Sequence, residues 1–442
     1  MAGKGLGNLK SAMGDERLEL FADLASNLPQ KSLQPLVSKP PLAQCEVCVI
    51  VPVRNEAQTL EATLNALTYQ IDLEGNKLDW RRYEVVLLAN NCSDNSAEIA
   101  RHFARLHPEL VLHVAETTLP PAEAYIGRVR QILMDEAYRR LVYIGRKQGI
   151  IASTDGDSQV TPPWIAANLA EIAAGAEAVG GRICTTKRSR ATLNPYAKAC
   201  YLREVGYRSL IAQLEDYIDP DPYDRFPRHY QHYGASLAVT AQMYKQAGGL
   251  PAVRTPEDVA FYQALLRVNA RFRHSPLVKV VTSARQTGRA ALGLANQLKQ
   301  WTLMEVDKQP FLVEPVNAIA LHLQVRHQLR LLWSGILDGY QPDNTHIAQI
   351  AVDLGITQQW LAKELMQPYT FGLLFERIEQ RQEQEGIWAQ RWQRVEIRQA
   401  IAELRLYLDK LRKNCDRTHC VKLPNSSLQE FTNLRTQVLI PS

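Results

Sequence analysis

The amino-acid sequence predicts an α/β protein in which an open, mostly parallel sheet is flanked by helices and followed by an all-helical C-terminal region. Between residues 45 and 290, short apolar runs alternate with segments of helical periodicity. The run 47–53 is almost continuously apolar and β-branched, as expected for a parallel strand covered on both faces. From about Ala290 onward the pattern is helical throughout.

The predicted elements follow one another in a regular order. A strand at 47–53 leads into Arg54-Asn55-Glu56-Ala57 and a helix, and a strand at 83–89 leads into the polar run 90–96 and a second helix. A third strand, a third helix and a further strand follow at 111–114, 128–138 and 149–153. Ligands of open α/β sheets gather beyond the carboxyl ends of the strands. We therefore expect the polar clusters that follow these strands to share one site.

The segment Thr154-Asp155-Gly156-Asp157 closes the apolar run 149–153 and carries two carboxylates one residue apart. Two such carboxylates repel each other unless positive charge lies between them, and a hard divalent cation with its own waters is the usual solution. Because such a cation also binds diphosphates, Asp155 and Asp157 indicate half of a nucleotide-diphosphate site. An ordinary acidic loop is the alternative for this short motif.

Four segments, in this order and spacing, resemble family 2 glycosyltransferases with the GT-A fold. They are Val49-Ile50-Val51-Pro52-Val53-Arg54-Asn55-Glu56, Asn90-Asn91-Cys92-Ser93-Asp94, Asp155-Gly156-Asp157 and Thr255-Pro256-Glu257-Asp258. The resemblance covers roughly Cys45 to Arg289, more than half of the chain. It implies an enzyme that uses a nucleotide sugar together with Mn²⁺ or Mg²⁺, but it does not specify the sugar or the acceptor.

The resemblance also implies roles for the nucleotide-binding residues. Pro52, Arg54 and Glu56 lie where the first strand ends, and the Arg54 guanidinium can stack on the base. Asn90 matches a position where many relatives have an aspartate that accepts the ring N–H of the base, and an asparagine carbonyl can also accept it. This departure leaves a UDP-sugar favoured and a GDP-sugar as the second choice. Asp155 is expected to face the ribose or the metal.

The same resemblance implies which residues bind the metal and which residue acts in catalysis. Asp157 is expected to coordinate the metal that bridges the diphosphate, and Asp258 to act as the general base that deprotonates the acceptor hydroxyl. The implied reaction is direct displacement that inverts the anomeric carbon. The segment Thr255-Pro256-Glu257-Asp258 also predicts a helix start with Thr255 as N-cap and Pro256 in the first helical position. Acids in a first turn that only complement the helix dipole are the alternative.

Three further features near the end of the α/β region are candidates for binding. Arg285 and Arg289 are candidate bidentate donors to the diphosphate, and His274 is a candidate metal ligand. For each, an exposed basic loop is the alternative. The stretch 216–233, rich in proline, tyrosine, aspartate and histidine, is a candidate acceptor-binding loop, with an ordinary surface loop as the alternative.

Length and composition set the remaining bounds. At 442 residues, the chain should hold one large and one smaller domain. Together with the resemblance, the sequence pattern divides it into a helical lead and linker (1–44), a glycosyltransferase domain (45–290) and a helical C-terminal domain (291–442). The net charge of +5 is too small to indicate nucleic acid by itself, and no apolar stretch approaches the ~20 residues that span a bilayer. Seven scattered cysteines favour reduced thiols in the cytoplasm, and peripheral membrane contact stays open.

Alternative functions follow from the same residues. A nucleotidyltransferase can share the acidic metal site, although the expected glycine-rich triphosphate loop is absent after the first strand. A non-catalytic binding protein on a degenerate transferase scaffold is suggested by Asn90. Residues 347–362 resemble a helix-turn-helix but carry little positive charge, which makes DNA binding the weakest option. The apolar seam along residues 397–411 indicates packing against the domain or, alternatively, a homodimer.

Overall fold

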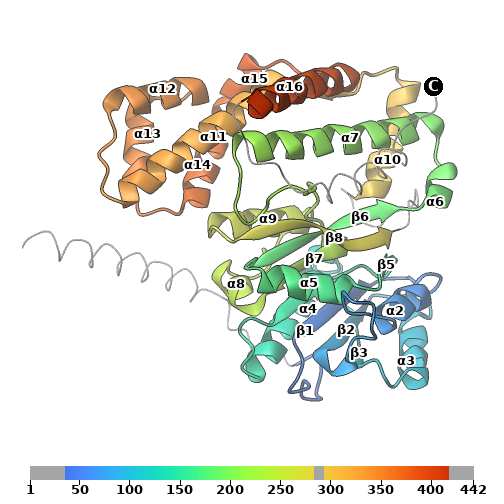
Figure 1. Cartoon of the computed structure of the whole chain (residues 1–442). Helices are drawn as coiled ribbons and strands as arrows, with labels where there is room; N and C mark the ends of the chain where they lie inside the picture. Colours follow the sequence, from blue (N-terminus) through green and yellow to red (C-terminus); the bar gives the residue numbers. More distant parts are fainter. Residues whose placement is uncertain (1–34, 283–292, 418–442) are drawn as a thin grey trace, which may run out of the picture.

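The computed structural model describes residues 35–282 and 293–417, and it contains an eight-stranded sheet with the strand order β3-β2-β1-β4-β7-β6-β8-β5 (Figure 1). The strands are β1 (Val47–Val53), β2 (Tyr83–Asn90), β3 (Leu112–Thr117), β4 (Ile150–Ser153), β5 (Ser158–Val160), β6 (Ala178–Thr185), β7 (Leu237–Thr240) and β8 (Phe272–Thr282). A separate two-stranded sheet joins β9 (Leu312–Val313) to β10 (Val395–Glu396).

The sheet is mostly parallel, as the apolar strand patterns predict. Strands β3, β2, β1 and β4 are parallel neighbours, whereas β7 runs antiparallel to both β4 and β6. Strand β8 is parallel to β6, and β5 closes the edge antiparallel to β8. Strands β1, β2, β4, β6 and β8 therefore all point their carboxyl ends toward the same side of the sheet. This arrangement confirms the expected open α/β architecture.

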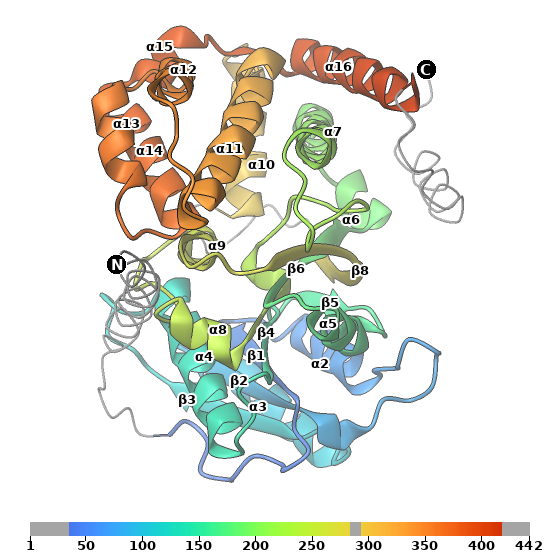
Figure 2. The same ribbon diagram turned by 60° about the vertical axis from the view of Figure 1, so that its left-hand side comes forward.

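Helices cover both faces of the sheet, and a helical C-terminal region lies above it (Figure 2). The helices of the α/β part are α2 (Leu60–Thr68), α3 (Ser96–Leu106), α4 (Ile126–Tyr143), α5 (Trp164–Ala173), α6 (Lys187–Ala191), α7 (Pro195–Ile218), α8 (Ala241–Gln246) and α9 (Glu257–Arg267). Those that follow are α10 (Leu294–Val306), α11 (Val316–Leu337), α12 (Asn344–Leu354), α13 (Gln358–Leu365), α14 (Phe371–Glu385), α15 (Ile387–Arg391) and α16 (Ile397–Arg417). Short 3₁₀ turns precede β2 and β7, at Trp80–Arg82 (η1) and Gly234–Ser236 (η2).

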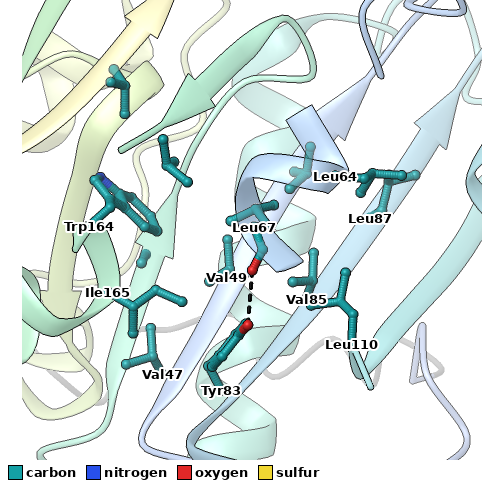
Figure 3. Close-up of a cluster of buried hydrophobic side chains, with 14 of the residues drawn as sticks. Val47, Val49, Leu64, Leu67, Tyr83, Val85, Leu87, Leu110, Trp164 and Ile165 are labelled. Carbon is teal, nitrogen blue, oxygen red and sulfur yellow. Dashed lines mark hydrogen bonds between the residues drawn. The ribbon is translucent and has the colours of Figure 1, made fainter. Parts of the chain in front are cut away.

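Alternate residues of the central strands β1, β2, β4 and β7 enter two separate apolar cores. On one face, Val47 and Val49 of β1 pack with Leu64 and Leu67 of α2 and with Trp164 of α5 (Figure 3). The opposite face of the sheet packs against α4, α8 and α9. A strand that is buried on both faces needs apolar side chains at every position, which is why the run 47–53 shows no polar alternation.

The C-terminal region is helical, as the sequence pattern predicts. Its last helix, α16, lies along α7 and buries Ile397, Leu404 and Leu408, three members of the apolar seam, within one chain. Helix α12 ends before Gly355, whose φ of 72° is left-handed, and Thr357 occupies the N-cap position of α13 without a side-chain capping hydrogen bond, so the expected tight helix pair is present. No helix in the described ranges is long and apolar enough to span a bilayer.

A fully buried ion pair joins Glu84 of β2 to Arg140 of α4, which packs on one face of the sheet. The Arg140 guanidinium donates to both carboxylate oxygens of Glu84 at 2.7 and 2.6 Å, and Arg140 also donates to the Lys39 carbonyl at 2.8 Å. Burial alone would raise the pKa of Glu84, but hydrogen bonds from Arg140 and His113 outweigh it and lower that pKa to about 2.

We predict that Glu84→Gln lowers the free energy of unfolding by about 3–5 kcal/mol, because the Arg140 charge is left buried without its partner. Urea unfolding monitored by circular dichroism measures the change. The matched control is Glu46→Gln, which removes a half-exposed ion pair with Arg82 and should change stability by less than about 1 kcal/mol. Equal losses in the two variants would contradict the importance of the buried pair.

The same carboxylate has a predicted pH signature. Because the folded-state pKa of Glu84 lies below its ordinary value of 4.5, its contribution to stability is complete above pH 4.5 and is lost as the pH falls toward 2. Glu84→Gln should therefore flatten the fall in unfolding free energy across this range. An unchanged slope in the variant would contradict this assignment.

Candidate active site

Two loops at the carboxyl ends of β1 and β2 are tied together by side-chain hydrogen bonds. Asn55, which has a left-handed φ of 54°, accepts from the Ser93 backbone N–H at 2.7 Å and donates to the Ser93 hydroxyl at 3.1 Å. The Glu56 backbone N–H donates to the Ser96 hydroxyl at 2.8 Å. Asparagine tolerates the left-handed region better than most residues. The first two motifs therefore form one rigid edge.

Asn90, the last residue of β2, contributes an unpaired acceptor to this edge. It is 2% exposed, and its Oδ1 atom has no hydrogen-bond partner within the described parts of the chain. The next residue, Asn91, has a left-handed φ of 48° and exchanges two hydrogen bonds of 3.0 Å with the Leu119 backbone, which anchors the turn. A buried carbonyl without a partner is unfavourable in the isolated protein, and such groups are often satisfied by a ligand.

The Asp155-Gly156-Asp157 turn packs directly against the first loop. A Cβ atom on Gly156 would lie 3.1 Å from a Val53 methyl and 3.3 Å from the Pro52 carbonyl oxygen, so a side chain here would have to push these neighbours apart. The Gly156 carbonyl accepts a hydrogen bond from the Thr63 hydroxyl of α2 at 3.1 Å. The two aspartates are thereby held beside the end of β1.

Arg130 of α4 joins this acidic turn to the start of α9. Its guanidinium donates to Asp155 Oδ1 at 2.9 Å and to Glu257 Oε1 at 3.2 Å, and it also contacts the Ser153 hydroxyl and the Gly234 carbonyl (3.0 Å). The residue is only 3% exposed. A buried guanidinium is tolerated because nearly every N–H faces an acceptor. One side chain therefore joins the acidic turn to the start of α9.

Asp258 lies at the start of α9, next to this bridge. Its Oδ2 atom accepts the Gly234 N–H at 2.9 Å and its Oδ1 atom accepts the Val259 N–H at 2.8 Å. The neighbouring Glu257 is 5% exposed, and burial raises the pKa of its carboxyl group. The negative charge of Asp258 also raises this pKa, whereas the positive charge of Arg130 lowers it. The two acids thus have different environments, because Glu257 is buried against Arg130 and Asp258 is partly exposed.

The start of α9 differs by one residue from the predicted helix start. The helix begins at Glu257 with Pro256 as the N-cap, and Thr255 lies outside it. The extended ψ of Pro256, 106°, keeps this residue out of the helix. The prediction of Thr255 as N-cap and Pro256 as the first helical residue was therefore wrong. The two acids still occupy the first turn.

Two glycines allow the elements around Arg130 to approach closely. A Cβ atom on Gly234 would lie 2.5 Å from the Arg130 Cζ atom, so any larger residue would displace the guanidinium. A Cβ atom on Gly127 would lie 2.1 Å from the Val253 carbonyl oxygen, where α4 meets the loop before α9. Both contacts are incompatible with a side chain.

The remaining candidate residues are distributed as follows. Arg54 is exposed and donates to the Ala124 carbonyl at 3.1 Å. His274 is 3% exposed, its Nδ1 atom lies 2.7 Å from Asp224, and it is in register with Gly180 on β6. The register places it three strands from β4, about 14 Å at the usual strand spacing, so it is not brought together with Asp155 and Asp157. Arg285 and Arg289 lie outside the described residues.

Arg130 is a central residue of the candidate site that the sequence analysis missed. A signal existed, because residues 130, 133, 137 and 140 lie on one helical face, on which Leu133 and Ala137 are buried in the core. A charged residue on an apolar face of a helix needs a buried partner. The spacing did not reveal which of the acids that partner would be.

A family model matches part of the chain. Residues 48–226 match the model of the family described as Glycosyl transferase family 2. The match covers less than half of the chain, and it confirms the resemblance drawn from the motifs. The match ends before Asp258, so the role of that residue depends on the geometry described above.

Individual relatives are more distant. Glycosyltransferase AglE of Haloferax volcanii is 28% identical over 138 residues, which cover 31% of this chain and 39% of that protein. A mannosyltransferase from Pyrobaculum calidifontis, in complex with GDP-Man and Mn²⁺, has a TM-score of 0.37 at 18% identity, covering 79% of this chain and 84% of that one. S. aureus TarS with UDP-GlcNAc has a TM-score of 0.41 at 12% identity, covering 77% and 92%. Similarities this low assign no substrate.

We predict that Arg130→Met lowers the free energy of unfolding by about 3–5 kcal/mol, because it leaves the Glu257 carboxylate buried without its partner. The control is Arg128→Met on the same helix, where a more exposed arginine lies 3.5 Å from Glu123, and a change below about 1 kcal/mol is expected. Urea unfolding measures both.

A double-mutant cycle tests the Arg130–Glu257 contact itself. Glu257→Gln in the Arg130→Met background should recover part of the lost stability, because the uncompensated charge is removed. Strictly additive effects of the two substitutions would show that the ion pair is not coupled.

Proposed function

We propose that the protein is a metal-dependent, inverting glycosyltransferase that moves a sugar from a nucleoside-diphosphate sugar to a hydroxyl group of an acceptor. The observation that carries this proposal is the Arg130 bridge. Through it, the Asp155-Gly156-Asp157 turn and the acidic start of α9 lie within one side chain of each other. A donor site and a general base must be adjacent for a displacement reaction at the anomeric carbon.

The residues of the acidic turn fit a divalent cation that is shared with a diphosphate. Asp155 uses Oδ1 for Arg130, its side chain is 34% exposed, and Asp157 is partly exposed. No cluster of three or more His, Cys, Asp or Glu side chains that suits a metal occurs in the described ranges. Mg²⁺ is usually bound by one or two carboxylates together with substrate phosphates and waters. Asp155 and Asp157 would hold the cation, which when bound neutralises charge on the departing diphosphate.

The base-binding end of the site is formed by the ends of β1 and β2. The unpaired Asn90 carbonyl offers an acceptor for a ring N–H, which uracil and guanine both provide. Pro52 and the exposed Arg54 border the same edge, and the Arg54 guanidinium has the planar shape to stack on a base. A UDP-sugar is the favoured donor. The Glu56 backbone, tied to Ser96, keeps the edge rigid.

Asp258 is the proposed general base. Each of its oxygens accepts one backbone N–H, so lone pairs are left to accept the proton of the acceptor hydroxyl. That hydroxyl oxygen forms the new bond to the anomeric carbon as the bond from this carbon to the diphosphate oxygen breaks on the opposite side. Glu257 is less suited to this role, because it is buried against Arg130. Arg285 and Arg289 remain proposed contacts of the diphosphate.

Thermal denaturation in the presence of nucleotides tests the proposed donor. UDP with Mn²⁺, at about 100 times its Kd, should raise the melting temperature by roughly 3 to 5 °C, since binding to the folded state alone stabilises it by about 2.7 kcal/mol. GDP is the matched comparison for base selectivity. If neither nucleotide shifts the melting temperature with Mn²⁺ or Mg²⁺, the proposed function is wrong.

Two substitutions separate metal binding from base catalysis. Asp157→Ala should abolish the Mn²⁺-dependent part of nucleotide binding, because a carboxylate ligand is lost. Asp258→Asn should retain binding but lower turnover by about 10²- to 10⁴-fold, the usual contribution of a general base. Nucleotide titration calorimetry and nucleoside-diphosphate release measure the two effects. Equal losses of binding in both variants would contradict the separate roles.

A further inference from the structure

The segment 231–236, which leads into β7, is fixed at both ends. Gln231 exchanges two hydrogen bonds with the Ile183 backbone of β6: its Oε1 atom accepts the N–H at 2.8 Å, and its Nε2 atom donates to the carbonyl at 3.2 Å. At the other end, the Ser236 hydroxyl accepts the Trp164 indole N–H of α5 at 3.0 Å. The residues between these two anchors therefore have a defined path.

Between its anchors, the segment makes two contacts with α9. The Gly234 backbone N–H donates to Asp258 Oδ2 at 2.9 Å. Two residues earlier, the His232 ring stacks on the Tyr262 ring, with centroids 3.9 Å apart and planes inclined by 8°. The first contact holds the proposed base, and the second lies next to it on the same helix.

The two contacts match in their spacing. Asp258 and Tyr262 are four positions apart in α9, so they share one face of the helix and lie about 6 Å apart along its axis. Tyr233 is extended, with φ −91° and ψ 156°, so His232 and Gly234 on either side of it lie about 6.6 Å apart along the chain. The segment therefore runs along this face of α9 and touches it at both points.

The Tyr262 ring is itself fixed by the sheet. Phe272 of β8 is 4% exposed, and its ring lies 4.8 Å from the Tyr262 ring at an angle of 79°. A nearly perpendicular arrangement is favourable for a pair of aromatic rings. Because Tyr262 is held from the sheet, the stack determines where residue 232 lies along α9.

The His232 ring adds no charge beside the base. Burial lowers the pKa of His232 to about 3, and the nearby charges of His274 and Arg208 act in the same direction. The imidazole is therefore neutral at pH 7. Its Nδ1 atom has no hydrogen-bond partner among the residues that the structure describes. The contact with Tyr262 thus depends on the planar ring rather than on charge.

We infer that His232 and Tyr262 are positioning residues for Asp258. Their stacked rings fix the segment 231–236 along α9, and the segment in turn directs the Gly234 N–H at the Asp258 carboxylate. This hydrogen bond sets the orientation in which the carboxylate meets the acceptor hydroxyl. The inference rests on the proposed function, in which the base must lie within hydrogen-bonding reach of the proton that it removes.

Turnover of a nucleotide sugar tests this inference. The donor is whichever of UDP-glucose, UDP-N-acetylglucosamine and GDP-mannose gives the largest thermal shift with Mn²⁺, and water serves as the acceptor. His232→Ala should lower kcat for release of nucleoside diphosphate by about 10- to 100-fold and change the KM for the donor by less than about 2-fold, because a small displacement of a reacting group is costly. Tyr262→Leu, which removes the stack from the side of α9, should act in the same way. His232→Phe keeps a planar ring and should restore kcat to within about 3-fold of the wild-type value.

Hydrogen exchange tests the contact without turnover. A peptide that covers residues 230–236 reports the Gly234 N–H, which should exchange about 10-fold faster in His232→Ala and at the wild-type rate in His232→Phe. The matched control is His107→Ala, which removes a ring stack of 4.1 Å on Phe103 of α3, on the opposite face of the sheet from α9. This control should change neither kcat nor the exchange of the peptide.

The outcomes separate failure of this inference from failure of the proposed function. An unchanged kcat in His232→Ala, unchanged exchange of the peptide, or no recovery of kcat in His232→Phe would each overturn the inference. Loss of the thermal shift with UDP and Mn²⁺ in His232→Ala would also overturn it, because donor binding would then be affected. If the wild-type protein binds the donor without hydrolysing it, the exchange result alone decides. Absence of the thermal shift in the wild-type protein would instead overturn the proposed function.

Discussion

The arrangement of the site depends on one buried guanidinium. Arg130 reaches from α4 between the carboxyl end of β4 and the start of α9, where it meets Asp155, Glu257 and the Gly234 carbonyl. Its charge is tolerable in the interior because two carboxylates face it, and it bridges these two carboxylates in turn. A Cβ atom on Gly234 would collide with the guanidinium, and one on Gly127 would collide with the Val253 carbonyl in the loop before α9. The two halves of the site are therefore joined by this ion-pair bridge, together with the Gly234 N–H that donates to Asp258.

Buried charge pairs also join the C-terminal helices to α7. Asp219, at the end of α7, is buried and pairs with Arg326 and Arg330 of α11, and the positive charges of these arginines lower its pKa against the effect of burial. The helical region thus has a structural task that its sequence did not disclose, which is to hold α7 over the carboxyl edge of the sheet. The seam of α16 that suggested either packing or a homodimer packs against α7.

The sequence predicts the sheet and the strand-end motifs well, because both depend on local patterns. Apolar β-branched runs such as 47–53 mark buried parallel strands, and the polar residues after them have nowhere to lie but the carboxyl edge. Contacts between residues that are distant in the sequence could not be predicted in this way. Arg130 and Gly234 are separated by 104 positions, so their contact follows from the packing of whole elements. His274 shows the converse: it looked like a metal ligand by sequence, yet strand register places it three strands away, with Asp224 as its partner. The sequence also does not reveal which nucleotide base Asn90 would contact, because an amide side chain can hydrogen-bond to more than one base.

A crystal structure with Mn²⁺ and UDP would test the central claim most directly. The account predicts the cation between the diphosphate and the Asp155 and Asp157 carboxylates, the uracil ring N–H within hydrogen-bonding distance of Asn90 Oδ1, and Arg130 still in contact with both Asp155 and Glu257. A nucleotide bound away from this edge, or a cation held by other side chains while Asp155 and Asp157 have no ligand, would contradict it.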